Sequence, residues 1–171
     1  CDFMALPIVT IMVPVLALGV FVHIFYGCYL TWYNIKARGG YRRYETASVA
    51  RADSWSAKNM FVLGIVILGI LFFHLSHFWA DMQLKEFMGD HAENPYELLT
   101  ATFGNIWVLI IYIIWFIAVF FHLTHGFWSM FQTVGWSNQV WMKRLKVIGV
   151  LVAAVILVLF TSVAVNAYIQ A

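Results

Sequence analysis

Four long apolar runs constrain this chain more than any other feature of its sequence. They lie at about Phe3–Ile35, Phe61–Ala80, Phe103–Thr133 and Val147–Ile169. Each is long enough for a helix that crosses a bilayer, which needs about 20 residues. Only 11% of the residues are charged, whereas soluble domains carry about 25%. Because lipid cannot satisfy an open strand edge, the sequence predicts an all-α integral membrane bundle that forms a single transmembrane domain over residues 1–171.

The charged residues indicate how the spans are oriented. All but one of the ten Lys and Arg residues lie in the first and third connections, and the exception is Lys85 in the second. By the positive-inside rule, loops 36–58 and 134–146 are predicted to be cytoplasmic and loop 81–102 external. The first span would then start outside, so we expect one further helix before Cys1 that begins in the cytoplasm.

Five of the six histidines lie inside the spans: His23, His74, His77, His122 and His125. An ionisable residue at membrane depth is costly and indicates a functional site by default. A lone histidine of this kind could equally form an ordinary hydrogen bond to a helix carbonyl. Five of them on three helices favour a shared cofactor.

The depth of these histidines points to haem. At 1.5 Å per residue, His23, His122 and His74 lie about 18, 17 and 20 Å from the inner ends of their spans. A shared level for His23 and His122 is what two axial imidazole ligands of one haem iron require. Gly27 and Gly126 follow these two histidines by four residues, on the same helix face. Such glycines provide a flat surface for a porphyrin, or equally permit close helix packing.

A non-haem metal site is the competing interpretation of the two His-x-x-His pairs, His74 with His77 and His122 with His125. Such sites usually recruit carboxylates or more histidines, and no Asp or Glu lies inside any span. We therefore expect His77 and His125 to hydrogen-bond to neighbouring groups or to pack. A metal-ion transporter that uses these pairs remains an alternative of a different class.

Four segments form a recognisable series: FVHIFYGCYLTWYNIKAR, DSWSAKNMFVLGIVILGILFFHLSHF, NPYELL and FFHLTHGFWSMFQTVGW. Their order and spacing resemble the single-chain di-haem cytochrome b membrane subunit of succinate dehydrogenase and fumarate reductase. The resemblance implies five helices and two b-type haems, with one axial histidine from each of four helices. It implies that His23 and His122 ligate the iron of the haem nearer the cytoplasm. His74 would ligate the outer haem iron with a histidine of the helix expected before Cys1. Position 120 is Phe where some fumarate reductases carry a proton-conducting glutamate, so that route is not expected here.

The resemblance also implies a function, which is electron transfer in a bacterial cytoplasmic (inner) membrane. Electrons would pass between an iron–sulfur subunit, the two haems and menaquinone, while a flavoprotein subunit on the cytoplasmic face interconverts succinate and fumarate. The basic loops would help to dock the iron–sulfur subunit, or would only fix the topology. The candidate quinone residues are Trp79 and Asp81. The inner haem propionates would emerge near Trp55, Ser56 and Lys58, which equally suit an interfacial belt and a helix start.

Other respiratory complexes provide the main alternative. A haem-bearing anchor of a nitrate reductase, hydrogenase or formate dehydrogenase also carries histidines on helices, at different spacings. The sequence assigns no catalytic residue to this chain and indicates no nucleic-acid partner. It leaves open the direction of the reaction and whether complexes pair into a dimer.

Overall fold

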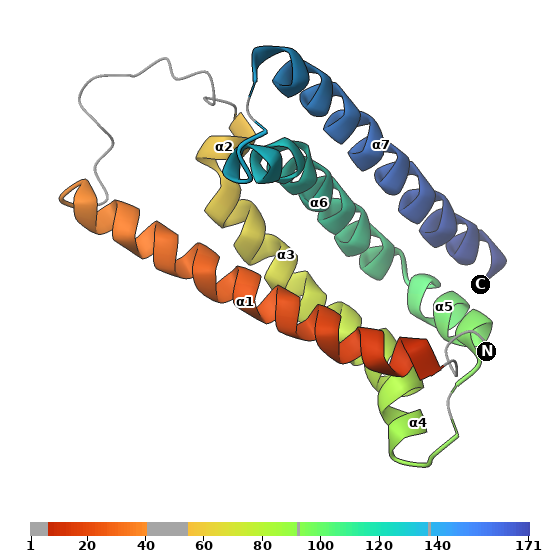
Figure 1. Cartoon of the computed structure of the whole chain (residues 1–171). Coiled ribbons are helices and arrows are strands. Elements are labelled where there is room, and N and C mark those ends of the chain that lie inside the picture. The colour runs from red at the N-terminus through yellow and green to blue at the C-terminus, as the bar shows by residue number, and fades with distance from the viewer. Residues whose placement is uncertain (1–6, 41–54, 92, 137) are drawn as a thin grey trace. The chain divides into compact units, whose positions relative to one another are not determined.

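The computed structural model describes residues 7–40, 55–91, 93–136 and 138–171. Every secondary-structure element in these residues is helical. The elements are α1 (Pro7–Ala37), α2 (Trp55–Lys58), α3 (Met60–His74), the π-helix η1 (Leu75–Leu84), α4 (Lys85–Phe87), α5 (Pro95–Phe103), α6 (Ile106–Thr133) and α7 (Gln139–Gln170) (Figure 1). The predicted all-α class is therefore confirmed.

Four helical stretches are long and apolar enough to cross a bilayer: Ile11–Ala37, Met60–Phe87, Ile106–Thr133 and Gln139–Gln170. They confirm the four predicted spans, and the protein is an all-α membrane protein. Two of these helical stretches are longer than the predicted apolar runs. Met60–Phe87 continues past Ala80, and Gln139–Gln170 begins eight residues before Val147. A helix does not stop where lipid stops. It ends where the backbone finds other hydrogen-bond partners.

Asparagine side chains mark the starts of three helices. Asn94, Asn105 and Asn138 each accept a hydrogen bond from a backbone amide in the first turn that follows. The donors are the amides of Tyr96, Trp107 and Trp141, at 3.0, 2.9 and 2.8 Å. Each contact satisfies one of the free amides at a helix start. Asn94-Pro95, the start of the segment NPYELL, thus begins α5.

The chain divides into two compact units, residues 1–51 and 52–171. Helix α1 is the described helix of the first unit. In the second unit, α6 packs along α7 and against α3, and α5 packs against α7 and α6. The Tyr96 hydroxyl donates a hydrogen bond of 2.8 Å to Oε1 of Gln170, which ties the start of α5 to the end of α7.

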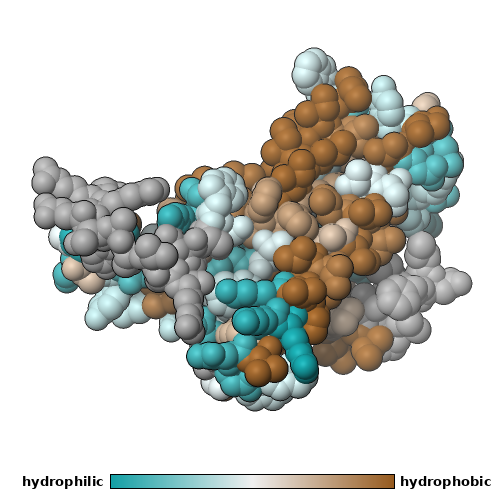
Figure 2. Space-filling model, turned by 90° about the horizontal axis from the view of Figure 1, so that it is seen from above, coloured by the Kyte–Doolittle hydropathy of each residue, from teal (hydrophilic) through white to brown (hydrophobic). Residues whose placement is uncertain are grey.

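Aromatic and small residues form the core of the second unit. Its buried members are Phe103, Leu109, Tyr112, Phe116, Ala164 and Ala167. The two alanines of α7 let the rings of α6 approach closely, as small residues do in membrane bundles. Large apolar side chains such as Val155 and Leu159 lie on the exterior, 57% and 59% exposed. Hydrophobic side chains also cover a broad area of the face in Figure 2. This surface suits contact with lipid.

Candidate cofactor-binding site

The intramembrane histidines lie on three helical segments. His74 ends α3, His77 lies in η1, and His122 and His125 lie in α6. These four belong to the second unit, whereas His23 lies in α1 of the first. The predicted pairing of His23 with His122 therefore stays a prediction. The second unit can be described by itself, and it places its histidines at two levels.

The first level is formed by His122 and a glycine of the neighbouring helix. A Cβ atom added to Gly64 of α3 would lie 4.0 Å from Cε1 of His122. The imidazole of His122 thus lies against a part of α3 that has no side chain. A Cβ added to Gly126, one turn further along α6, would meet no atom within 4 Å. No described residue of the second unit therefore packs on Gly126, and the two interpretations of this glycine, a flat surface for a porphyrin or close packing with another helix, stay predictions.

Helix α2 lies near this first level. The ring of Trp55 is 5.3 Å from the ring of Phe121, the residue before His122, and the two rings meet edge to face. Ser56 is buried beside it, at 9% exposure. The segment in which we expected inner propionates thus packs on α6 beside a predicted ligand.

The second level is an aromatic enclosure around His74. The centroid of its ring lies 5.2 Å from that of Phe78, 5.3 Å from that of Trp115 and 6.2 Å from that of Tyr112. Tyr112 is the most deeply enclosed large side chain of the described residues, at 1% exposure. Sequence reasoning missed Tyr112, although a tyrosine in the middle of an apolar run is a polar group at membrane depth and was a usable signal.

Three buried polar atoms in this enclosure have no hydrogen-bond partner among the described residues. They are Nδ1 of His74, the hydroxyl of Tyr112 and Nε1 of Trp115. Leaving such an atom unpaired costs about 1–3 kcal/mol, so native proteins rarely leave them so. A histidine that binds a metal through one nitrogen normally donates a hydrogen bond from the other. No described residue supplies that acceptor to Nδ1 of His74, so the enclosure holds free donors that a bound group with acceptor atoms could satisfy.

The contacts set the spacing of the two levels. Gly64 and His74 are ten residues apart on α3, and Tyr112 and His122 are ten residues apart on α6. Both separations correspond to about 15 Å along a helix. Since Gly64 faces His122 and Tyr112 faces His74, the two helices independently agree on this spacing. Counting from the span ends puts His74 and His122 at nearly the same depth, about 20 and 17 Å. The contacts correct that estimate, because α6 continues much further past His122 than α3 extends before Gly64.

His77 and His125 contact aromatic rings that lie three or four residues away along the chain. The ring of His77 meets that of Phe73 edge to face at 4.0 Å, and the ring of His125 meets that of Trp128 at 4.8 Å. Nδ1 of each is buried and finds no hydrogen-bond partner among the described residues. Within those residues, no three His, Cys, Asp or Glu side chains gather in one place. These contacts agree with the packing role expected for the two histidines, which stays a prediction.

The π-helix η1 begins directly after His74 and was not foreseen. Helices of this type are rare and frequently lie at functional sites. Nothing in the sequence LSHFWADMQL signals it, because the segment contains neither proline nor glycine. It carries both candidate quinone residues. Trp79 is 36% exposed, and the carboxylate of Asp81 lies 2.8 Å from Nζ of Lys85.

Comparisons with known proteins add no family assignment. No family model, no curated protein and no solved structure matches this chain.

Proposed function

We propose that this chain is the haem b-binding membrane anchor of a succinate:quinone oxidoreductase complex in a bacterial cytoplasmic membrane. The observation that carries the proposal is the spacing of His74 and His122. Two histidine levels about 15 Å apart along α3 and α6 suit two cofactors stacked across one bilayer. The open face beside Gly126 and the unpaired donors around His74 support it independently.

At the inner level, His122 and His23 would be the two axial ligands. Glycine follows each of them by four residues, at Gly126 and Gly27, so a planar macrocycle would meet no side chain there. Trp55, Ser56 and Lys58 lie on α2, which packs on α6 at this level. They are suited to contact the propionate edge.

At the outer level, His74 would be one axial ligand, and its partner histidine would come from outside these 171 residues. The Tyr112 hydroxyl and Trp115 Nε1 would donate hydrogen bonds to acceptor groups near the bound haem. These bonds would remove the free-energy cost of two unpaired buried donors. Haem b, when bound, accepts and releases one electron at its iron, and the protein tunes the potential through axial ligation, hydrogen bonds and burial. The surrounding aromatic rings exclude water from the site.

Menaquinone would react near the outer level, where η1 carries Trp79 and Asp81 beyond His74. The flavoprotein and iron–sulfur subunits would bind on the opposite, predicted cytoplasmic, face. Moving one electron across the whole membrane changes its free energy by about 2.3 kcal/mol per 100 mV of membrane potential, favourably or unfavourably according to the direction. Two stacked haems would therefore make the direction of the reaction sensitive to that potential.

Reduced-minus-oxidised spectra of membranes that contain the intact complex test this proposal. We expect His122→Ala to lose about half of the low-spin b-type haem of the wild type, because one of two axially ligated haems is lost. The matched control is His125→Ala, which changes a histidine one turn away and should keep all of it. Equal haem content in both variants would contradict the ligand assignment. Co-purified flavin identifies the partner, whereas molybdenum or nickel would indicate another respiratory complex. A chain without any low-spin haem would favour the metal-ion transporter.

A further inference from the structure

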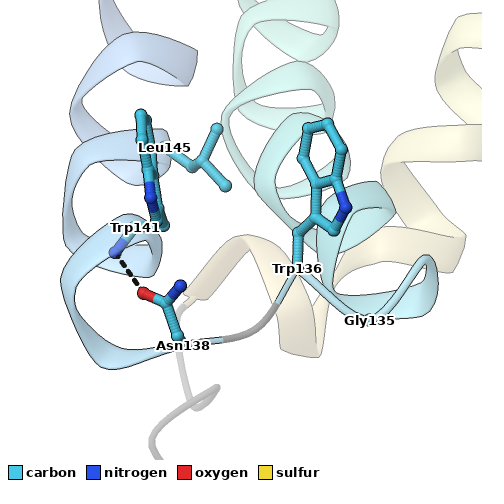
Figure 3. Close-up of a pocket in the computed structure, with 5 residues that line it drawn as sticks. All are labelled: Gly135, Trp136, Asn138, Trp141 and Leu145. Atoms are coloured by element: carbon cyan, nitrogen blue, oxygen red, sulfur yellow. Dashed lines mark hydrogen bonds between the residues drawn. The ribbon is translucent and has the colours of Figure 1, made fainter.

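The turn between α6 and α7 holds a pocket with a volume of about 440 Å³. Five residues line it: Gly135, Trp136, Asn138, Trp141 and Leu145. The indoles of Trp136 and Trp141 stand on its two sides, and Leu145 points between them (Figure 3). All five belong to the second unit. The electron-transfer proposal makes no use of this pocket, here named the Trp136–Trp141 pocket.

Local contacts hold the ring of Trp136 and the backbone of the turn that carries the pocket. The ring of Trp136 stacks on that of Phe131 at 5.7 Å. Oδ1 of Asn138 accepts a hydrogen bond of 2.8 Å from the backbone amide of Trp141 (Figure 3). Gly135 has a φ of 91°, a conformation that only glycine adopts readily. These contacts order the turn that carries the pocket, while the two indoles stay 64% and 50% exposed and so accessible to a ligand.

The charge around the pocket is positive. Arg144 places its guanidinium carbon 5.4 Å from the ring centroid of Trp141, a wall of the pocket. Lys143 precedes it and is exposed. In the described part of the chain, every acidic residue lies between Asp81 and Glu97, and no Asp or Glu follows Glu97 anywhere in the sequence. Such a region attracts an anion.

The pocket also marks the depth at which charge gives way to apolar sequence. Lys146 is the last charged residue of the chain, and Leu145 beside it is 7% exposed. Tryptophan side chains are enriched at the level of lipid headgroups. A ligand here would meet a cation at one end and indole and leucine surface at the other. That combination fits an amphiphile better than a free ion or a soluble protein.

We propose that the Trp136–Trp141 pocket binds the headgroup region of an anionic phospholipid from the cytoplasmic leaflet. The phosphate lies against Arg144, and the first part of an acyl chain lies between the two indoles over Leu145. Basic pockets between transmembrane helices are known sites for anionic headgroups. The proposal needs no haem, so it stands or falls separately from the electron-transfer function.

Native mass spectrometry of the detergent-solubilised full chain tests the site. The probes are phosphatidylglycerol and phosphatidylcholine with identical acyl chains. We expect the wild type to bind phosphatidylglycerol more tightly. Arg144→Gln should weaken that binding about fivefold, the effect of one cation near an anionic lipid. Arg144→Lys should restore most of it, and Trp141→Leu should weaken the binding of both lipids.

The matched control is Lys146→Gln. It removes one positive charge from the same helix, but Nζ of Lys146 lies 4.4 Å from the ring of Trp128, which does not line the pocket, whereas Arg144 lies over the lining residue Trp141. It should change binding less than twofold. If Arg144→Gln and Lys146→Gln weaken phosphatidylglycerol binding equally, general surface charge explains the binding and the proposed site is wrong.

Three competition results would also overturn the proposal. Displacement of the lipid by millimolar inorganic phosphate would show a simple anion site. Displacement by a soluble menaquinone analogue would show a quinone pocket. Displacement by a purified iron–sulfur subunit would show a protein-docking surface. An absence of preference between the two lipids would remove the role of charge altogether.

Discussion

Two glycines of the second unit respond in opposite ways to an added methyl group, and together they test where the cofactor lies. Gly126 is in α6 and Gly149 in the neighbouring α7. A Cβ on Gly126 meets no atom within 4 Å, whereas a Cβ on Gly149 would lie 3.0 Å from Cδ1 and 3.3 Å from Cβ of Phe127. The Cβ of Phe127 cannot rotate away, so only a shift of the helices relieves that contact.

The magnitudes follow from these distances. Gly126→Ala should raise the unfolding free energy of the haem-free protein by about 1 kcal/mol, because alanine favours helix by that amount over glycine. Gly149→Ala gains the same term, but overpacking costs about 1–3 kcal/mol. Its unfolding free energy should therefore be unchanged or fall by up to about 2 kcal/mol. Unfolding in detergent, followed by far-ultraviolet circular dichroism, measures both.

Haem content provides the second readout. Gly126→Leu should still fold without haem, because a Cβ at this position meets no described atom within 4 Å. It should lower the haem bound per chain, because its side chain would occupy the face proposed for the macrocycle. Gly149→Ala should keep its haem as long as the protein stays folded. Full haem content in Gly126→Leu, together with raised stability, would refute the placement of the cofactor beside His122 and Gly126.

Three further predictions concern other residues of the bundle. His74→Ala should lose about half of the b-type haem, since one of two axially ligated sites is removed. His77→Ala should keep its haem. A similar loss of haem in the two variants would contradict the assignment of His74 as a ligand and His77 as a packing residue. Tyr112→Phe removes a buried hydroxyl without a partner and keeps the ring. In the haem-free protein it should not lower the unfolding free energy, whereas in the haem-loaded protein it should shift the reduction potential of one haem, seen by redox titration. Tyr96→Phe removes the hydrogen bond to Gln170 and should cost about 0.5–1.5 kcal/mol. This loss of stability should be seen as faster proteolysis at the end of α7. Unchanged proteolysis would mean that the hydrogen bond does not stabilise this end.

The four membrane-spanning stretches could be predicted from the sequence because lipid imposes a simple rule. An apolar run of sufficient length has to be helical, and the runs from Phe61 and from Phe103 indeed became α3 with η1 and α6. Asn94-Pro95 likewise carries its signal locally, since one side chain caps the helix that follows. Features that depend on a few neighbouring residues were readable.

Features that depend on how two helices pack against each other could not be predicted from the sequence. The contact of Gly64 with His122 depends on the register of α3 against α6, and hydropathy does not encode that register. Counting from the span ends could not give the axial distance between His74 and His122 for the same reason. The π-helix has no local composition signal either, and the aromatic packing of His74 with Tyr112 and Trp115 became visible only in three dimensions.

The same register explains why the histidine levels and the Trp136–Trp141 pocket lie in different environments. From His122 to the end of α6 at Thr133 is about 16 Å, whereas from Gly64 back to the start of α3 at Met60 is only about 6 Å. The inner end of α6 therefore extends about 10 Å beyond the start of α3, and α7 accompanies it there. His122 lies where α3 covers α6, while the turn after Thr133 lies beyond that cover. One offset between two helices thus places the proposed cofactor ligand where α3 covers α6, and it places the basic, tryptophan-lined turn beyond the start of α3.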